Sequence, residues 1–311
     1  MKNPFLYSDS NKRYHTYDYF LRQRFGKKVF KVTLDAGFTC PNIDGTKGVG
    51  GCTYCSSRGS GDFAPPSTLP IEMQYNIVRE TMEKKWEGGL CIPYFQAHTN
   101  TYAPLKVLKE NFEKALLLPN AVGLDIATRA DCISDETAEY LRELHERTFL
   151  TVELGLQSIH DRTAEKINRC HTYEEFLHGY EKLRGLNVCI HIINGLPGED
   201  REMMLDTARE LSRLDPFMIK IHLLHIIKGT KMAEEYVSGE FTLPTLEEYV
   251  STVCDQIELL SPETVIGRVT GDGAPDSLIA PDWSRKKFVV MNEIDKELLR
   301  RDSMQGAKKW K

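Results

Sequence analysis

Short apolar segments followed by amphipathic stretches recur along this chain, and this order constrains its fold more than any other feature. The segments are rich in Val, Ile, Leu and Phe, as expected of strands buried on both faces of a sheet. The predicted strands are 28–34, 91–96, 121–127, 149–154, 187–193 and 216–226. A βα order of this kind requires right-handed crossovers and a parallel sheet, so the predicted fold class is α/β.

Capping residues mark several of the predicted helix starts. Ser134 precedes two acidic residues, which favours a helix N-terminus there. Thr172 with Glu175, and Thr245 with Glu248, form two capping boxes. After residue 262 we expect a last strand, a loop rich in Gly, Pro and Asp, and a terminal helix. Together with the helix that Thr172 opens, the predicted helices before this tail are 70–86, 104–117, 135–147, 199–214 and 246–260.

Two closures compete for such a sheet, an open doubly wound sheet and a complete or partial barrel. His191 and His222 alternate with apolar residues on consecutive predicted strands, so each shares a face with residues two positions away. Such polar side chains favour a barrel lumen that holds a polar ligand, although a pair of hydrogen-bonded core histidines is the competing interpretation. We expect a partial (β/α)6 TIM-like barrel over 28–230, with extensions over 1–27 and 231–311.

Charge is distributed unevenly along the 311 residues, whose net charge is −5. Residues 1–31 carry eight Lys and Arg against two acidic residues, and 284–311 carry nine against four. These basic ends are either a nucleic-acid footprint or merely solvated termini.

The sequence also predicts the compartment. It has eight cysteines without regular spacing, and we find neither a secretory leader nor an apolar run of about 18 residues. These features predict a cytoplasmic protein without a membrane span.

Three cysteines lie close together in CPNIDGTKGVGGCTYC, immediately after the first predicted strand. They are Cys40, Cys52 and Cys55, with eleven residues in the first gap and two in the second. In a βα barrel this loop lies at the C-terminal face, where active sites are built. Three thiolates favour an iron–sulfur cluster with one open iron. A zinc site completed by His98, or unligated thiols, are the alternatives.

This loop followed by βα units resembles the radical S-adenosylmethionine (SAM) superfamily, where the commonest spacing is CxxxCxxC. The wider first gap is similar to the branch that contains the Elongator catalytic subunit. YFQAHTNTYAP (94–104) lies where the superfamily contacts the SAM amino group, although it lacks the usual Gly-Gly-Glu. Further matching segments are TRADCI, ELGLQS, INGLPGE and HIIKGT after later strands, and TGDGAP and LIAPDW in the tail.

The resemblance implies that the three cysteines hold a [4Fe-4S] cluster whose free iron binds SAM. Reductive cleavage of SAM would then allow hydrogen to be abstracted from a substrate in the lumen. The resemblance also implies cofactor-binding roles for polar residues near the strand ends. These residues are Gln96, Thr99, Arg129, Glu153, Gln157, Asn194 and His222.

Bacterial proteins that resemble this chain are associated with tRNA wobble-uridine modification. The resemblance therefore implies a tRNA substrate whose carboxymethylaminomethyl group at the uridine 5-position is converted towards aminomethyluridine. It also implies an electron donor such as flavodoxin or ferredoxin. Two alternatives are a radical SAM enzyme acting on a small molecule or protein, and a non-catalytic zinc or iron–sulfur interaction protein.

Four aromatic residues near the N-terminus, Tyr14, Tyr17, Tyr19 and Phe20, could stack a flipped base. The preferred interpretation is that they form a patch that docks on the barrel.

Overall fold

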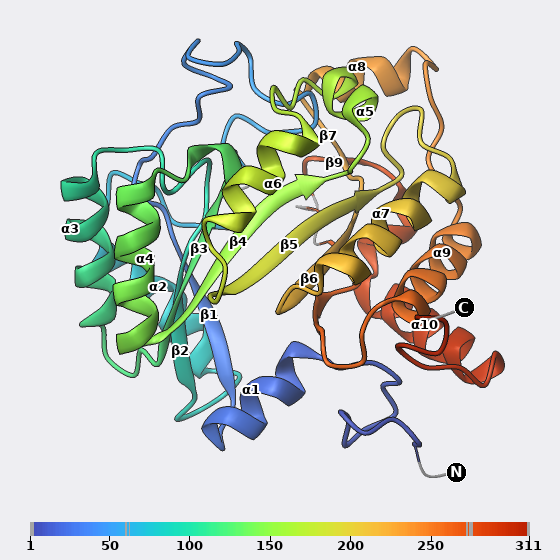
Figure 1. Ribbon diagram of the computed structural model, residues 1–311, viewed down its shortest axis with the longest axis horizontal. Helices are drawn as coiled ribbons and strands as arrows, with labels where there is room; N and C mark the ends of the chain where they lie inside the picture. Colours follow the sequence, from blue (N-terminus) through green and yellow to red (C-terminus); the bar gives the residue numbers. More distant parts are fainter. Residues whose placement is uncertain (1–2, 60, 62, 272, 274–275, 310–311) are drawn as a thin grey trace.

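The computed structural model describes residues 3–59, 61, 63–271, 273 and 276–309, so Asp272 of TGDGAP lies outside the described residues. Seven strands form one curved parallel sheet, as Figure 1 shows. They are β1 (Val29–Leu34), β2 (Leu90–Phe95), β3 (Gly123–Thr128), β4 (Phe149–Gln157), β5 (Asn187–Asn194), β6 (Met218–Leu223) and β8 (Val265–Arg268). They pair in the order β1-β2-β3-β4-β5-β6-β8. The sheet is an incomplete barrel, which confirms the predicted fold class.

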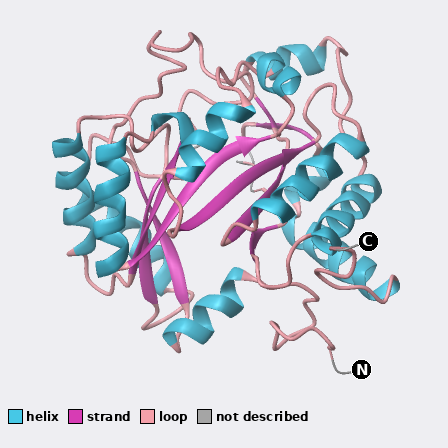
Figure 2. Ribbon diagram, in the orientation of Figure 1, coloured by secondary structure: helices cyan, strands magenta, loops and turns pink. Residues whose placement is uncertain are grey.

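Helices pack around the outside of this sheet (Figure 2). Threonine N-caps and glutamates at the third helical position complete both predicted capping boxes, at Thr172 and Thr245. None of the described helices is long and apolar enough to cross a membrane. The helices are α1 (Tyr17–Phe25), α2 (Ile71–Glu83), α3 (Leu105–Leu116), α4 (Asp135–Arg147), α5 (Asp161–Lys166), α6 (Tyr173–Glu181), α7 (Arg201–Leu214), α8 (Lys231–Val237), α9 (Leu246–Leu259) and α10 (Lys287–Arg300), with 3-10 turns at Ala130–Cys132 and Asp282–Arg285.

The predicted sixth strand, 216–226, is divided between two sheets. β6 ends at Leu223, and the next strand, β7 (Ile226–Ile227), pairs antiparallel with β9 (Leu278–Ala280). The apolar pattern continues through both β6 and β7, so it does not show where the chain passes from the main sheet to the two-stranded sheet. The predicted last strand is β8, which pairs with β6 and extends the main sheet beyond six strands.

Side chains alternate between the outer core and the interior of the barrel, as period-2 strands require. On β5, Ile190 and Ile192 pack in the main core, whereas His191 between them lines an internal cavity. On β6, Ile221 belongs to the same core and His222 lines the cavity. Both imidazoles therefore face the lumen, and neither belongs to the core between sheet and helices.

The first helix closes the N-terminal end of the barrel with aromatic side chains. The ring of Phe20 lies 5.9 Å from that of Phe149 and 5.1 Å from that of Phe217, measured between centroids. Phe149 begins β4 and Phe217 directly precedes β6, and Tyr14 is buried in the main core. Tyr17 and Phe20 pack against the same apolar clusters beneath the barrel, so for Tyr14, Tyr17 and Phe20 the structure favours the docking interpretation.

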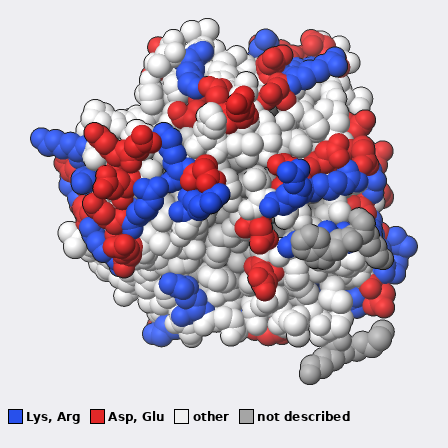
Figure 3. Space-filling view, in the orientation of Figure 1, with Lys and Arg blue, Asp and Glu red and all other residues white. Residues whose placement is uncertain are grey.

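Apart from Lys31, which lines the internal cavity, the two basic ends of the chain meet on the side of the barrel away from the cysteine loop (Figure 1). Lys12 forms an ion pair with Asp295, and Arg13 Nη1 lies 3.1 Å from Asp302 Oδ1. Part of the basic charge of both ends is therefore matched by neighbouring carboxylates. On the face drawn in Figure 3, blue Lys and Arg side chains are likewise interspersed with red Asp and Glu side chains over α3, α4 and α7.

Candidate active site

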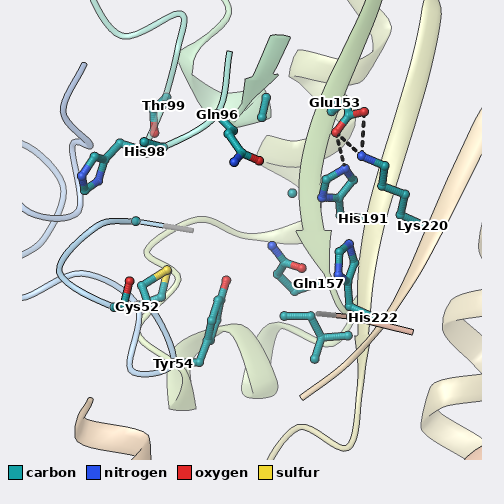
Figure 4. A pocket seen from close by; sticks show the side chains of 18 of the residues that line it. Cys52, Tyr54, Gln96, His98, Thr99, Glu153, Gln157, His191, Lys220 and His222 are labelled. Atoms are coloured by element: carbon teal, nitrogen blue, oxygen red, sulfur yellow. Dashed lines mark hydrogen bonds and ion pairs between the residues drawn. The ribbon is translucent and has the colours of Figure 1, made fainter. Parts of the chain in front are cut away.

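A cavity of about 490 Å³ joins the cysteine loop to the lumen of the barrel. Figure 4 shows Cys52 at one end and the strand side chains at the other. The structure therefore brings most of the predicted site residues together. Those that line the cavity are Cys40, Cys52, Cys55, Gln96, Thr99, Arg129, Glu153, Gln157 and His222.

Asn194 is the exception among the predicted cofactor-binding residues. Its side-chain amide exchanges two hydrogen bonds with that of Gln256 on α9, at 2.8 and 2.9 Å. Asn194 is buried and does not line the cavity, because the parity of β5 places it on the core side with Ile190 and Ile192. Asn194 therefore connects the barrel to α9 of the C-terminal extension, and it does not make the expected cofactor contact.

The cysteine loop folds into tight turns that direct its thiols towards one space. The Ile43 N–H donates to the Cys40 carbonyl at 2.8 Å, and the Cys55 N–H donates to the Cys52 carbonyl at 3.0 Å. Gly51 has a φ of 74°, a left-handed conformation that glycine adopts without strain. The glycines of this loop therefore allow close turns around the three cysteines.

The sulfur of Cys52 lies in an electropositive environment. Asn42 Nδ2 is 3.5 Å and Arg169 Nη1 is 3.9 Å from Cys52 Sγ. A hydrogen bond from Cys55 and the guanidiniums of Arg169 and Arg129 hold the pKa of the Cys52 thiol well below its usual value, although burial opposes this. The thiolate, which is the metal-binding form of cysteine, is therefore favoured here.

The distances between possible ligand atoms distinguish a site for an iron–sulfur cluster from a site for a single zinc ion. Within the described residues, one group of three potential ligands lies within 4.8 Å of one another, formed by Glu153, Cys189 and His191. Neither the loop cysteines nor His98 form such a group, although bonds of about 2.3 Å from sulfur to one zinc ion would require it. A cluster distributes its thiolates over different irons. The loop therefore fits a cluster better than a zinc site completed by His98.

Arg129 lies just after β3 and lines the cavity close to the cysteines. Its Nε and Nη2 atoms each donate to a carboxylate oxygen of Asp131 at 2.9 Å. Although burial opposes ionisation, Arg129 and Lys47 hold the pKa of Asp131 far below its usual value. Arg129 Nη1 is buried with no hydrogen-bond partner among the described residues. The two N–H groups of Nη1 thus remain for a bound anion.

Polar side chains form the walls between the cysteines and the deep lumen. In Figure 4, Gln96 and Thr99 extend from the segment after β2, while Gln157 stands at the end of β4. Thr99 Oγ1 is buried without a hydrogen-bond partner among the described residues. Gln157 has a φ of 75°, a conformation that is costly for a residue with a side chain and is typical of ligand sites. These residues offer hydrogen bonds to a polar ligand.

Glu153 lies across the cavity from Cys52, where basic side chains surround its carboxylate (Figure 4). Lys220 Nζ lies 2.7 and 2.6 Å from its two oxygens, and Lys31 Nζ lies 2.6 Å from Oε1. His191 Nε2 completes the shell at 2.9 Å from Oε2. Lys31 also forms an ion pair with Asp125. Glu153 is therefore already saturated by protein donors.

The protonation of this network follows from burial and from the neighbouring charges. Burial disfavours ionised Glu153, but Lys220 and Lys31 hold its pKa well below the usual value. Burial lowers the pKa of Lys220 to about 8, and Glu153 limits that decrease. Burial, reinforced by Lys220, lowers the pKa of His191 to about 4. At neutral pH Glu153 is thus a carboxylate, Lys31 and Lys220 are ammonium groups, and His191 is a neutral imidazole.

Sequence reasoning missed Lys31, Lys220 and Arg169 as residues of the site. Lys220 could have been found, because it stands two positions before His222 and so shares its face of β6. Arg169 lies in the loop after α5, where no local pattern marks it as a neighbour of Cys52.

Comparisons with known proteins agree with this geometry. The family model for the Radical SAM superfamily matches residues 45–211, and that for the Radical_SAM C-terminal domain matches 216–300. The chain is 52% identical to the uncharacterized protein YtqA of Bacillus subtilis, over 98% of this chain and 95% of that protein. In fold it is similar to Methanocaldococcus infernus Elp3, with a TM-score of 0.65, 19% identity, and coverage of 89% of this chain and 64% of that one.

Two further relatives carry informative names. A tRNA uridine(34) acetyltransferase of Methanocaldococcus jannaschii is 30% identical, over 46% of this chain and 27% of that protein. Human Elongator complex protein 3 is 26% identical, over 75% of this chain and 49% of that protein. These matches confirm the relation to the Elongator branch. They contradict the alternative of a non-catalytic interaction protein, because the family consists of enzymes that use a [4Fe-4S] cluster and SAM. The chain with this three-cysteine loop on a partial barrel belongs to the radical SAM superfamily.

Proposed function

We propose that this radical SAM enzyme converts the carboxymethylaminomethyl group of a tRNA wobble uridine to aminomethyl. The observation that carries the proposal is the cavity in which the cysteine loop opens onto a polar, charged lumen. The similarity to a tRNA uridine(34) acetyltransferase and to Elongator complex protein 3 supports the choice of substrate, because position 34 is the wobble position.

The residues of the cavity have complementary roles in this proposal. Cys40, Cys52 and Cys55 hold the cluster, which together with SAM supplies reductive C5′–S cleavage and hydrogen abstraction when both are bound. Gln96, Thr99 and Gln157 offer hydrogen bonds to the amino, carboxylate and ribose groups of SAM. The N–H groups on Nη1 of Arg129 are suited to the SAM carboxylate.

The location of the basic ends limits their part in binding tRNA. They lie away from the cysteine loop, so a uridine that enters the cavity contacts other residues first (Figure 1). We propose that the tRNA contacts centre on the cavity mouth and that the ends contribute through long-range attraction to phosphates. A flavodoxin or ferredoxin is the proposed electron donor, and the cytoplasm, where tRNA is modified, is the proposed compartment.

Phe63 is the aromatic side chain best placed to stack on the target base. It lines the cavity and is nevertheless 54% exposed. Stacking of a base on an aromatic ring contributes about 1–3 kcal/mol. We therefore expect Phe63→Ala to raise the KM for tRNA about tenfold, while Phe63→Tyr, which keeps the ring, stays near wild type. Steady-state kinetics check this, and an unchanged KM in Phe63→Ala would exclude stacking at this position.

The proposed substrate is tested in cells by mass spectrometry of tRNA nucleosides. A strain without this chain should accumulate carboxymethylaminomethyluridine, because the step that removes its carboxymethyl group is missing. Wild-type protein should restore the profile, and the Cys55→Ala variant should not. If the nucleoside profile of the deletion strain is unchanged, the substrate is a small molecule or a protein.

A further inference from the structure

The deep end of the cavity contains charged groups that neither the cluster nor the proposed SAM contacts use. Lys220 and His222 stand two positions apart on β6, so both point into the lumen, and Arg268, the register partner of Lys220 on β8, lines it as well. We propose that this end of the lumen is a carboxylate-binding site, in which Lys220 and His222 receive the carboxylate of the substrate side chain. The inference rests on the proposed function, whose substrate carries an N-carboxymethyl group.

The ammonium group of Lys220 is held in a defined position. It donates to both oxygens of Glu153 and lies 5.0 Å from the centre of the Tyr94 ring. A buried ion pair of this kind adds little stability compared with apolar residues of similar size. Its location in the lumen of an enzyme therefore indicates a role in ligand binding. An ammonium has three N–H donors, and the two contacts with Glu153 leave one for a ligand.

His222 supplies a second polar atom without a partner. Its Nε2 is buried and has no hydrogen-bond partner among the described residues, while its ring lies 5.1 Å from that of His191 between centroids. Burial of an unpaired polar group is unfavourable, and a ligand that hydrogen-bonds to it removes this cost. His222 and Lys220 together can thus bind the two oxygens of one carboxylate.

The charges at this end favour an anion over a metal cation. Glu153, Cys189 and His191 lie close enough together to resemble a cation site. However, both carboxylate oxygens of Glu153 already accept from Lys220, and Lys31 binds Oε1 as well. A metal ion would meet two ammonium groups there. With a pKa of about 8, Lys220 is mainly cationic at neutral pH, which suits a carboxylate ligand.

The titratable and charged groups around Lys220 come from every strand of the sheet. Their combined field sets the charge that a ligand meets at this end of the lumen. They are Lys31 on β1, Tyr94 on β2, Asp125 on β3, Glu153 on β4, Cys189 and His191 on β5, His222 on β6 and Arg268 on β8.

Binding without turnover tests this site. Protein with reconstituted cluster and SAM, but without reductant, is titrated with two anticodon stem-loops that carry either carboxymethylaminomethyluridine or aminomethyluridine. We expect wild type to bind the first about tenfold more tightly, because a charge-assisted hydrogen bond is added. Lys220→Met should lose this preference and keep its affinity for the second RNA. Lys84→Met, the same replacement at an exposed position after α2, should retain the preference.

A second variant tests the site independently, in case Lys220→Met does not fold. His222→Phe keeps an aromatic ring beside His191 and should weaken the preference severalfold, with the absorbance of the cluster unchanged. Equal affinity of wild type for the two RNAs, or a preference retained in Lys220→Met, would overturn the site. If the RNAs bind equally while the deletion strain still accumulates substrate, the carboxylate site fails alone. If neither RNA binds and tRNA nucleosides are unchanged, the proposed function fails with it.

Discussion

Replacing Cys55 by alanine is expected to abolish the brown colour of the anaerobically reconstituted protein and its production of 5′-deoxyadenosine. Cys55, Cys40 and Cys52 line one end of the cavity, and no other described cysteine lines it. A cluster that loses one of three protein ligands is not retained. Because changes beside a ligand already cost about 10–100-fold, we expect a loss of at least a hundredfold here. Iron content, electron paramagnetic resonance and product analysis measure the effect.

Cys170 provides the matched control for this variant. Its sulfur lies near the cysteine loop, since a Cβ atom on Gly48 would come within 2.7 Å of it. It donates to Asn168 Oδ1 at 3.3 Å, and burial raises its pKa, so it behaves as a protonated thiol. Cys170→Ala should therefore keep its iron and its SAM cleavage. Loss of the cluster in Cys170→Ala, or SAM cleavage that persists in Cys55→Ala, would show that the ligand set is wrong.

Replacing Glu153 by glutamine should destabilise the fold by about 3–5 kcal/mol, the cost of leaving buried charges uncompensated. Glu153 is 1% exposed and neutralises Lys220 and Lys31, both of which it contacts within 2.7 Å. Glutamine has nearly the same shape but no charge, so Lys220 would lose its carboxylate partner, while Lys31 would keep its ion pair with Asp125. Denaturant unfolding of the apo proteins, compared with wild type, measures the change.

Two further variants identify the cause of such a loss. Glu110→Gln removes an exposed carboxylate that pairs with Lys114 on α3, and it should leave stability unchanged within error. Glu153→Gln combined with Lys220→Met removes the ammonium group that Glu153→Gln leaves unpaired, and it should recover part of the stability. If Glu153→Gln is no less stable than Glu110→Gln, the buried network does not contribute as described.

The local features of the fold could be read from the sequence because they depend on short-range chemistry. Capping at Thr172 and Thr245 involves residues three positions apart, so the pattern and the structure coincide. The period-2 alternation around His191 and His222 correctly placed both imidazoles in the lumen. The same alternation could not show that 216–226 divides between two sheets, because the identity of a strand's partner depends on distant residues.

The location of the candidate site was likewise readable, but its charge network was not. The loop of Cys40, Cys52 and Cys55 follows the first strand, and topology alone carries such a loop to the C-terminal face of a barrel. Glu153 looked like a cofactor contact, yet the closure of the sheet surrounds it with Lys31 and Lys220 from other strands.

By itself, the sequence determined the βα order, the helix starts and the three-cysteine loop, since each is encoded within a few neighbouring residues. The tertiary structure alone decided which side chains meet across the lumen, that Asn194 pairs with Gln256, and that the basic ends lie away from the cavity mouth. These outcomes depend on the curvature and register of the sheet, which arise from contacts between residues far apart in the chain. They determine where cofactor contacts end and the proposed carboxylate site begins.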